Sequence, residues 1–461
     1  MNRKKIILKK DDIDILKESL SELEKGFKSL PSFKSVSGNK KRIQAVLKEA
    51  AQRLQNNFPY FHPLYAGQML KPPHEIARLS YILAMWINPN NHALDGGRAS
   101  SEMEKESVAG IAKMLGWKKH LGHLTSGGTM ANLEALWIAG QINPGKKIIA
   151  SSQSHYTHSR ISNVLKLDYE SVDCDESGRM NIGDLEVKLK KRNVGTVVVT
   201  IGTTAIGAVD PLEDILQLQK KYKFRIHADA AYGGYFTLAT NLNPYIKRIY
   251  KLLPEVDSIV VDPHKHGLQP YGCGCILFRD PAVGKFYKHD SPYTYFSSDE
   301  LHLGEISLEC SRPGAAAVAL WSTMKLFPLI KGGEYSLMLN ASRKAAFSFY
   351  NKLKNDKRFL TGPKPELDIV TWVPLASTIT EISLLSKRIF NECAKRNLYL
   401  ALAELPIKFF NLKDKNIGLD KKTVTCLRSV LMKPEHNAWI NPIWKILDEA
   451  TKSSIRKVER K

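Results

Sequence analysis

The run Ser258–His266 is an apolar stretch that ends in a proline-bounded turn, and this turn presents His264 and Lys265. Lysine seldom stands at the exit of a buried strand. A lysine amine that has lost part of its water there becomes nucleophilic enough to form an imine with an aldehyde. Because His-Lys pairs are also common on surface turns, this pattern predicts a site only together with other residues.

A carboxylate stands at the end of a second apolar run, Phe224–Gly234, where Asp229 precedes Lys265 by 36 residues. A carboxylate that faces a pyridine nitrogen keeps that nitrogen protonated, and the cationic ring then accepts the electrons left when a bond to Cα breaks. A helix cap or a turn is the ordinary alternative for a lone aspartate. The two residues predict imine chemistry on a pyridine ring if they reach the same ring.

A loop of small residues, Leu124–Asn132, leads into an expected helix over 130–140. Gly127 and Gly128 would let the backbone approach an anion closely, and the hydroxyl of Thr129 together with the helix start favours a phosphate. An ordinary N-cap is the alternative for this loop.

Two smaller pieces follow other apolar runs. His155 comes just after residues 146–150, and its flat ring could stack on a pyridine and move a proton. Thr204 stands at the end of the run 196–202 and could hold a ring substituent.

The elements that must position these residues alternate along the chain. From 119 to 319, short apolar runs of strand length alternate with helical stretches, which is typical of a mostly parallel sheet wrapped by helices. Helical spacing over 11–30 and 40–56 predicts an N-terminal helical arm, and strand-like runs after 331 predict a smaller C-terminal α+β unit. We expect three parts, at 1–75, 76–330 and 331–461.

Composition sets wider limits. The chain has 461 residues, of which 43% are hydrophobic and 25% charged, as in ordinary folded proteins. Its six cysteines include no CxxC pair, so no metal site or disulfide framework is expected. The net charge of +22 is scattered along the chain, which favours a solvated basic surface over nucleic-acid binding. No run is long enough for a membrane span, and we expect a cytoplasmic protein.

Together the pieces resemble the fold-type-I, group II decarboxylases that use pyridoxal 5'-phosphate (PLP). The resemblance covers roughly residues 58–326 and is closest to bacterial tyrosine decarboxylases; related families act on glutamate and aromatic amino acids. It is carried by the motifs TSGGTMAN, QSHY, GTT, HADAAYGG and DPHKHG, and also by FHPLYAGQM and NPNNHALDGGRASSEMEKE.

The resemblance implies a role for each matching residue. Lys265 would hold PLP as a Schiff base, Asp229 would pair with the pyridinium, and His155 would stack on the ring. The remaining cofactor contacts would be Gly127, Gly128, Thr129, Thr204, Ala231 and His264.

Three features depart from the family pattern. Many members have asparagine where this chain has Asp262, so a direct phosphate contact there is in doubt. The segment after Lys265 is short for the mobile loop whose tyrosine returns a proton in aromatic-amino-acid decarboxylases, and Tyr293 and Tyr295 are the candidates. Arg312, in a Ser-Arg-Pro-Gly run similar to sphingosine-phosphate lyases, could bind a substrate carboxylate or phosphate, or form a structural salt bridge.

We therefore expect a PLP-dependent decarboxylase of an L-amino acid, aromatic and tyrosine-like. The alternatives are a decarboxylase of aspartate or glutamate and a carbon–carbon lyase of the sphingosine-phosphate-lyase type. A basic protein that keeps the fold but binds nucleic acid is a third reading, which the complete cofactor set disfavours. Family members are dimers with sites at the subunit interface, so a homodimer is expected, with the helical arm around the partner.

Overall fold

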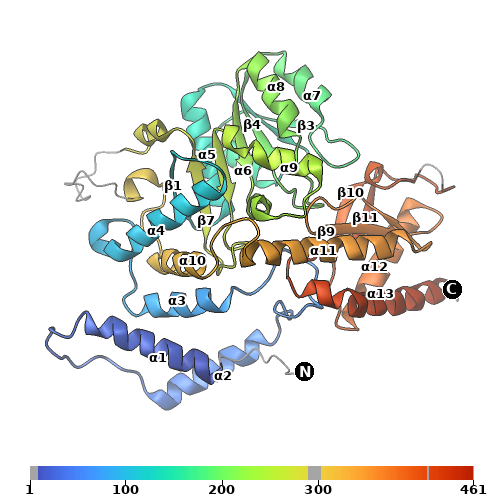
Figure 1. Cartoon of the computed structure of the whole chain (residues 1–461). Helices are drawn as coiled ribbons and strands as arrows, with labels where there is room; N and C mark the ends of the chain where they lie inside the picture. Colours follow the sequence, from blue (N-terminus) through green and yellow to red (C-terminus); the bar gives the residue numbers. More distant parts are fainter. Residues whose placement is uncertain (1–8, 289–302, 413–414, 460–461) are drawn as a thin grey trace.

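The computed structural model describes residues 9–288, 303–412 and 415–459. It begins with an arm of two helices, α1 (Lys10–Lys25) and α2 (Lys40–Leu54), which lie beneath α3 (Glu75–Met85) in Figure 1. The side chain of Asn39 caps α2 by accepting the backbone N–H of Arg42. No residue of α2 is buried, so this helix finds little apolar cover in its own chain.

A seven-stranded sheet forms the centre of the molecule, in the order β1-β7-β6-β5-β4-β2-β3. Four of its strand pairs are parallel, whereas β7 runs antiparallel to both of its neighbours. The strands are β1 (Leu121–Thr125), β2 (Lys147–Ser151), β3 (Tyr169–Val172), β4 (Val194–Thr200), β5 (Arg225–Asp229), β6 (Ser258–Val261) and β7 (Gly274–Phe278).

Helices cover both faces of this sheet because successive side chains of a strand point to opposite sides. In β4, Val197 and Val199 join the core that includes α4 and α8, whereas Val198 packs with α5 and α6. A strand buried on both faces is rich in apolar residues, and β4 carries four valines among its seven buried positions. The helices are α4 (Leu94–Met114), α5 (Gly128–Ile142), α6 (Thr157–Val164), α7 (Ile182–Leu189), α8 (Leu212–Tyr222), α9 (Pro244–Lys251) and α10 (Gly314–Leu326).

The C-terminal unit is a four-stranded antiparallel sheet, in the order β10-β11-β9-β8, packed with three helices at the right of Figure 1. Its strands are β8 (Phe359–Thr361), β9 (Ile369–Pro374), β10 (Ala401–Pro406) and β11 (Thr423–Val430), and its helices are α11 (Glu334–Lys354), α12 (Ile379–Ala394) and α13 (His436–Glu459). Short 3-10 helices occur at Gly234–Leu238, Leu253–Glu255, Pro281–Phe286, Leu303–Ile306 and Ile407–Phe409.

The predicted fold class is confirmed: a mostly parallel sheet wrapped by helices, a smaller α+β unit and a helical arm. The sequence did not predict β1, β3 or β8, which are short or partly exposed. The proposed boundaries at residues 75 and 330 stay a prediction. Within the described ranges, no helix combines the length and the apolarity that crossing a bilayer requires.

Candidate active site

Three neighbouring parallel strands bring the predicted residues to one edge of the central sheet. Thr200 at the end of β4 is in register with Asp229 at the end of β5, and Asp229 is in register with Val260 of β6. A cavity of about 360 Å³ opens at this edge, a size in the usual range for small-ligand sites. It is lined by Ser126, Gly127, Gly128, Thr129, Met130, Asn132, His155, Thr157, Thr200, Gly202, Thr204, Asp229, Ala231, Tyr232, Asp262, His264 and Lys265.

Lys265 reaches the cavity from the turn that follows β6. The turn is closed by the Lys265 N–H, which donates to the carbonyl of Asp262 at 2.9 Å. The Lys265 ammonium lies 3.1 Å from Oδ2 of the same aspartate, whose side chain is buried. His264 Nε2 is 3.5 Å from that oxygen. Asp262 is therefore the counter-ion of Lys265, a contact that the sequence did not predict.

Asp229 is buried and held by two donors. His158 Nε2 lies 2.8 Å from its Oδ2, and the backbone N–H of Ala231 donates to its Oδ1 at 3.1 Å. Burial pushes the pKa of Asp229 up, but the hydrogen bond from His158 and the nearby charge of Lys265 outweigh it and hold the pKa below its usual value. The carboxylate thus stays ionised inside the protein. Pairing with a protonated ring nitrogen requires this ionised form.

The predicted phosphate loop lies at the start of α5. The first amides of a helix have no carbonyl partners within it, so Gly128 and Thr129 present N–H groups to the cavity, where an anion is favoured. A Cβ on Gly128 would stand 2.6 Å from Asp262 Oδ2, so only glycine fits this close approach. His264 donates Nδ1–H to the carbonyl of Cys273 at 2.8 Å, which directs its Nε2 away from that carbonyl.

His155, Ala231 and Thr204 complete the lining. His155 Nδ1 lies 2.5 Å from Thr157 Oγ1, which fixes the ring, and burial lowers the pKa of its imidazole. All nine residues expected to bind the cofactor therefore line one cavity. The glycine cradle, the free helix amides, the amine and the buried carboxylate are the donor set that PLP requires, so the residues fit this cofactor.

The structure does not bring every predicted residue to this cavity. Arg312 is buried elsewhere: its guanidinium donates to Glu104 Oε1 at 2.9 Å and lies 3.3 Å from His123 Nδ1. It therefore forms the structural salt bridge that the sequence left open beside ligand binding. Tyr293 and Tyr295 lie outside the described residues.

A larger cavity, of about 790 Å³, lies between the loop around Ser177 and the C-terminal unit. Two of its cationic side chains are already paired, Arg179 with Glu366 and Lys408 with Asp173. Neither Lys265 nor Asp229 lines it, so the smaller cavity is the candidate active site.

Sequence reasoning missed several residues at the site. His158 supports Asp229, and Tyr232 lines the cavity while donating its hydroxyl to Asp368 at 2.5 Å. Arg428 of β11 donates to the carbonyls of Thr204 and Ala205 from the C-terminal unit. The only available signal was for His158, three residues after His155 at the start of a helix; the other contacts join distant parts of the chain.

Comparison with known proteins places this arrangement among decarboxylases. Residues 137–373, about half of the chain, match the family model described as the pyridoxal-dependent decarboxylase conserved domain. L-tyrosine decarboxylase of Enterococcus faecium is 26% identical over 74% of this chain and 74% of its own length. A probable L-tyrosine/L-aspartate decarboxylase of Methanothermobacter thermautotrophicus is 30% identical over 56% of this chain and 70% of its own.

Solved structures agree on the fold. The crystal structure of Oryza sativa TDC with PLP and tryptamine superposes with a TM-score of 0.76 at 16% identity, covering 97% of this chain and 99% of that one.

Proposed function

Because the chain belongs to the pyridoxal-dependent decarboxylase family and is a PLP-dependent amino-acid decarboxylase, we propose that its substrate is an aromatic, tyrosine-like L-amino acid. The charge of the cavity carries this proposal. Among the described lining residues, Lys265 is the only lysine or arginine, and it is the residue expected to hold the cofactor. An acidic side chain would need a further cation, whereas a neutral ring needs none.

We assign the cofactor to the residues that meet in the cavity. When bound, PLP supplies an aldehyde and a protonated pyridine ring that accepts the electrons released as carbon dioxide leaves. Lys265 is proposed for the aldehyde, Asp229 for the ring nitrogen and His155 for the ring face. The phosphate is assigned to Gly127, Gly128, Thr129 and His264, and the remaining contacts to Thr204 and Ala231.

A proton must return to the substrate carbon after carbon dioxide leaves. His155 and Lys265 are described groups in the cavity that can carry it. His155 suits this role because its ring is only half-buried and is fixed by Thr157. Tyr293 and Tyr295, proposed from the sequence, belong to the segment outside the described residues.

The substrate carboxylate needs a cation outside the cofactor contacts, and we assign it to Arg428. This side chain is buried, yet its hydrogen bonds go to neutral oxygens, those of Gly67, Gln68, Thr204 and Ala205. Arg428 is not a lining residue of the cavity, so to bind an anionic ligand next to Thr204 its guanidinium must give up one of these hydrogen bonds.

An acidic substrate is the second candidate, because the Methanothermobacter relative carries aspartate as well as tyrosine in its name. Such a substrate has an α-carboxylate and a side-chain carboxylate. Arg428 would then have to bind both, or another group would have to bind one of them. The lyase alternative was favoured by the Ser311–Gly314 run and by the basic surface. Arg312 of this run lies in a buried ion pair, which removes the first of these two grounds.

The test is a screen of the twenty amino acids for carbon dioxide release by the purified protein with PLP, with product amines identified by mass. We expect tyrosine or another aromatic amino acid to react fastest. The Lys265→Ala variant should lose both turnover and the visible absorption of bound cofactor. Preferred release from aspartate would replace the proposed substrate, and an aldehyde formed without carbon dioxide would indicate the lyase.

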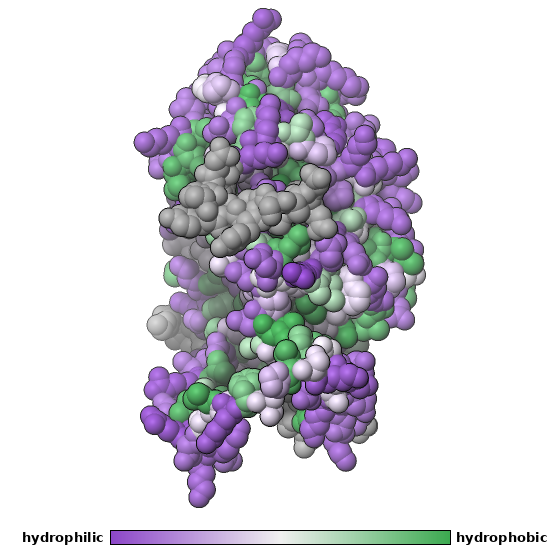
Figure 2. Space-filling model, turned by 90° about the vertical axis from the view of Figure 1, so that its left-hand side faces the viewer, coloured by the Kyte–Doolittle hydropathy of each residue, from purple (hydrophilic) through white to green (hydrophobic). Residues whose placement is uncertain are grey.

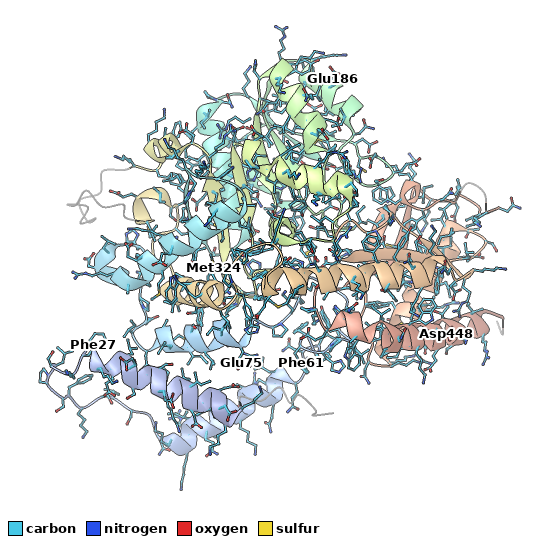
Figure 3. All side chains as sticks on the ribbon, in the orientation of Figure 1. Phe27, Phe61, Glu75, Glu186, Met324 and Asp448 are labelled. Atoms are coloured by element: carbon cyan, nitrogen blue, oxygen red, sulfur yellow. The ribbon has the colours of Figure 1, made fainter. Side chains whose placement is uncertain are left out.

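We also propose a homodimer with the active site at the subunit interface. Apolar side chains of the arm stand exposed, among them Val46, Leu47 and Leu54 of α2. Phe27 and Phe61, near opposite ends of the arm in Figure 3, are also exposed, and Figure 2 shows green hydrophobic surface in its lower half. Light scattering should give twice the chain mass of 51.9 kDa; a monomer that remains fully active would contradict the proposal.

A further inference from the structure

We propose that His158 is a positioning residue that acts through Asp229: its ring N–H holds the carboxylate in the form and orientation that the cofactor ring nitrogen needs. The inference deepens the proposed function and rests on the role assigned there to Asp229. It concerns a residue behind the cavity wall, because His158 itself is not part of the lining.

His158 reaches this position from the first turn of α6. Its backbone N–H donates to the carbonyl of His155 at 3.1 Å, so the cavity-lining histidine and the buried one are fixed by the same turn. The side chain of His158 has no exposed surface. A polar ring in such a place needs a partner, since an unpaired buried polar group is costly.

That partner is the carboxylate at the end of β5. His158 Nε2 and Asp229 Oδ2 are 2.8 Å apart, while the Ala231 N–H takes the other oxygen at 3.1 Å. Each carboxylate oxygen thus accepts one N–H, from the buried His158 or from Ala231, and Asp229 itself lines the cavity. An ionised carboxylate only accepts hydrogen bonds, so Nε2 carries the hydrogen.

In the described parts of the chain, the ring of His158 makes few other contacts. Its Nδ1 is buried and has no hydrogen-bond partner there. Its ring meets that of His227 edge to face at 6.4 Å. The hydrogen bond to Asp229 is therefore the polar contact that explains a histidine at this position.

The physical effect follows from the balance of forces on Asp229. The charged or titratable groups that face it are His158, His155, His227 and Lys265. Burial favours the neutral acid, and donation from His158 favours the carboxylate. If the donor is removed, a proton shared between Asp229 and the nitrogen of a bound ring would lie closer to Asp229. The ring would then carry less of the positive charge that lets it accept electrons.

The experiment compares histidine variants of the full-length holoenzyme loaded with PLP labelled with ¹⁵N in the ring. His158→Phe keeps an aromatic ring but removes the donor, and His158→Gln places an amide N–H near the position of Nε2. His158→Asn, too short to reach Asp229, replaces the Phe variant if that one fails to fold. His123→Phe is the matched control, because His123 also pairs with a buried carboxylate but lies outside the cavity.

We expect the ring-nitrogen signal of His158→Phe to move toward that of an unprotonated pyridine, and His158→Gln to restore most of it. With a substrate from the screen, kcat should fall by about 10- to 100-fold, the range for residues that support a site from behind, with little change in KM. The signal of His123→Phe should stay where it is in the unmodified protein.

Two outcomes separate this inference from the proposal beneath it. An unchanged ring-nitrogen signal in His158→Phe, with a changed one in Asp229→Asn, would overturn the role of His158 alone. If Asp229→Asn also leaves the signal unchanged, the carboxylate does not serve the ring nitrogen and the assignment of Asp229 fails first.

Discussion

Among the buried histidine–carboxylate pairs of the described residues, two have nearly the same nitrogen–oxygen distance. His158 Nε2 lies 2.8 Å from Asp229, and His123 Nε2 lies 2.9 Å from Glu134. All four side chains are buried. Distance and burial alone therefore do not distinguish these two pairs.

The surroundings of the two pairs differ. Glu134 also accepts the hydroxyl of Tyr287 at 2.9 Å, and His123 Nδ1 lies 2.8 Å from the carbonyl of Leu124, so protein groups surround this pair. Asp229 instead borders a cavity. The comparison teaches that a buried carboxylate indicates a site when part of it faces space that a ligand can fill.

The largest effect is expected around the His123–Glu134 pair, where Arg312 donates a hydrogen bond to Glu104 and lies next to His123. Arg312→Met should lower the free energy of unfolding by about 3–5 kcal/mol, because it leaves the buried Glu104 without its positive partner. Urea unfolding measures the loss. The folded variant should still bind PLP with the normal visible absorption, because Arg312 does not line the cavity.

A second substitution supplies the control. Arg312→Met combined with Glu104→Gln removes both charges while an amide keeps some of the hydrogen bonds from Asn91 and Leu124. The double variant should therefore be more stable than Arg312→Met alone. Loss of cofactor absorption from a stable Arg312→Met protein would instead give Arg312 the ligand role that its sequence context first suggested.

The same comparison shows what the sequence could predict of the fold. The runs that became β2, β4, β5, β6 and β7 are short and rich in apolar residues, as strands buried on both faces are. β1 lies at one edge of the sheet, and its residues Leu121 and Gly122 are only partly buried. Its apolar signal is correspondingly weak, and pairing with β7, about 150 residues later, is what makes it a strand.

The sequence predicted the site residues that lie at strand ends. It did not predict the residues that reach the site from distant parts of the chain. Asp229 ends β5 and Lys265 lies in the turn after β6, so their types and positions were enough to place them at one edge of a parallel sheet. Arg428 reaches Thr204 from more than 200 residues away, and no local pattern records that contact. Arg312 could not be assigned either, because a buried ion pair and a ligand site ask for the same residue type.

The smallest expected effect concerns His227, whose ring lies beside that of His158 on the far side of the His158–Asp229 pair from the cavity. His227 Nε2 faces Asn132 Oδ1 at 2.8 Å and its Nδ1 faces Ser258 Oγ at 2.9 Å. Burial is the main cause that lowers its pKa to about 3. In the unfolded chain the same imidazole titrates near 6.5. Between these two values the unfolded state binds a proton that the folded state refuses, so stability must fall as the pH falls.

Each pH unit below about 6.5 should therefore lower the free energy of unfolding by about 1.4 kcal/mol for this one histidine. His436, buried at the start of α13, contributes in the same direction, because burial lowers its pKa to about 3 as well. Urea midpoints of the cofactor-free protein between pH 7.5 and 5 measure the slope. His227→Gln and His436→Gln should each reduce it, and by additive amounts, since the two lie in different units. If His227→Gln left the slope unchanged, water would reach the side chains behind Asp229. The surroundings of the His158–Asp229 pair would then not be dry, and its comparison with the His123–Glu134 pair would fail.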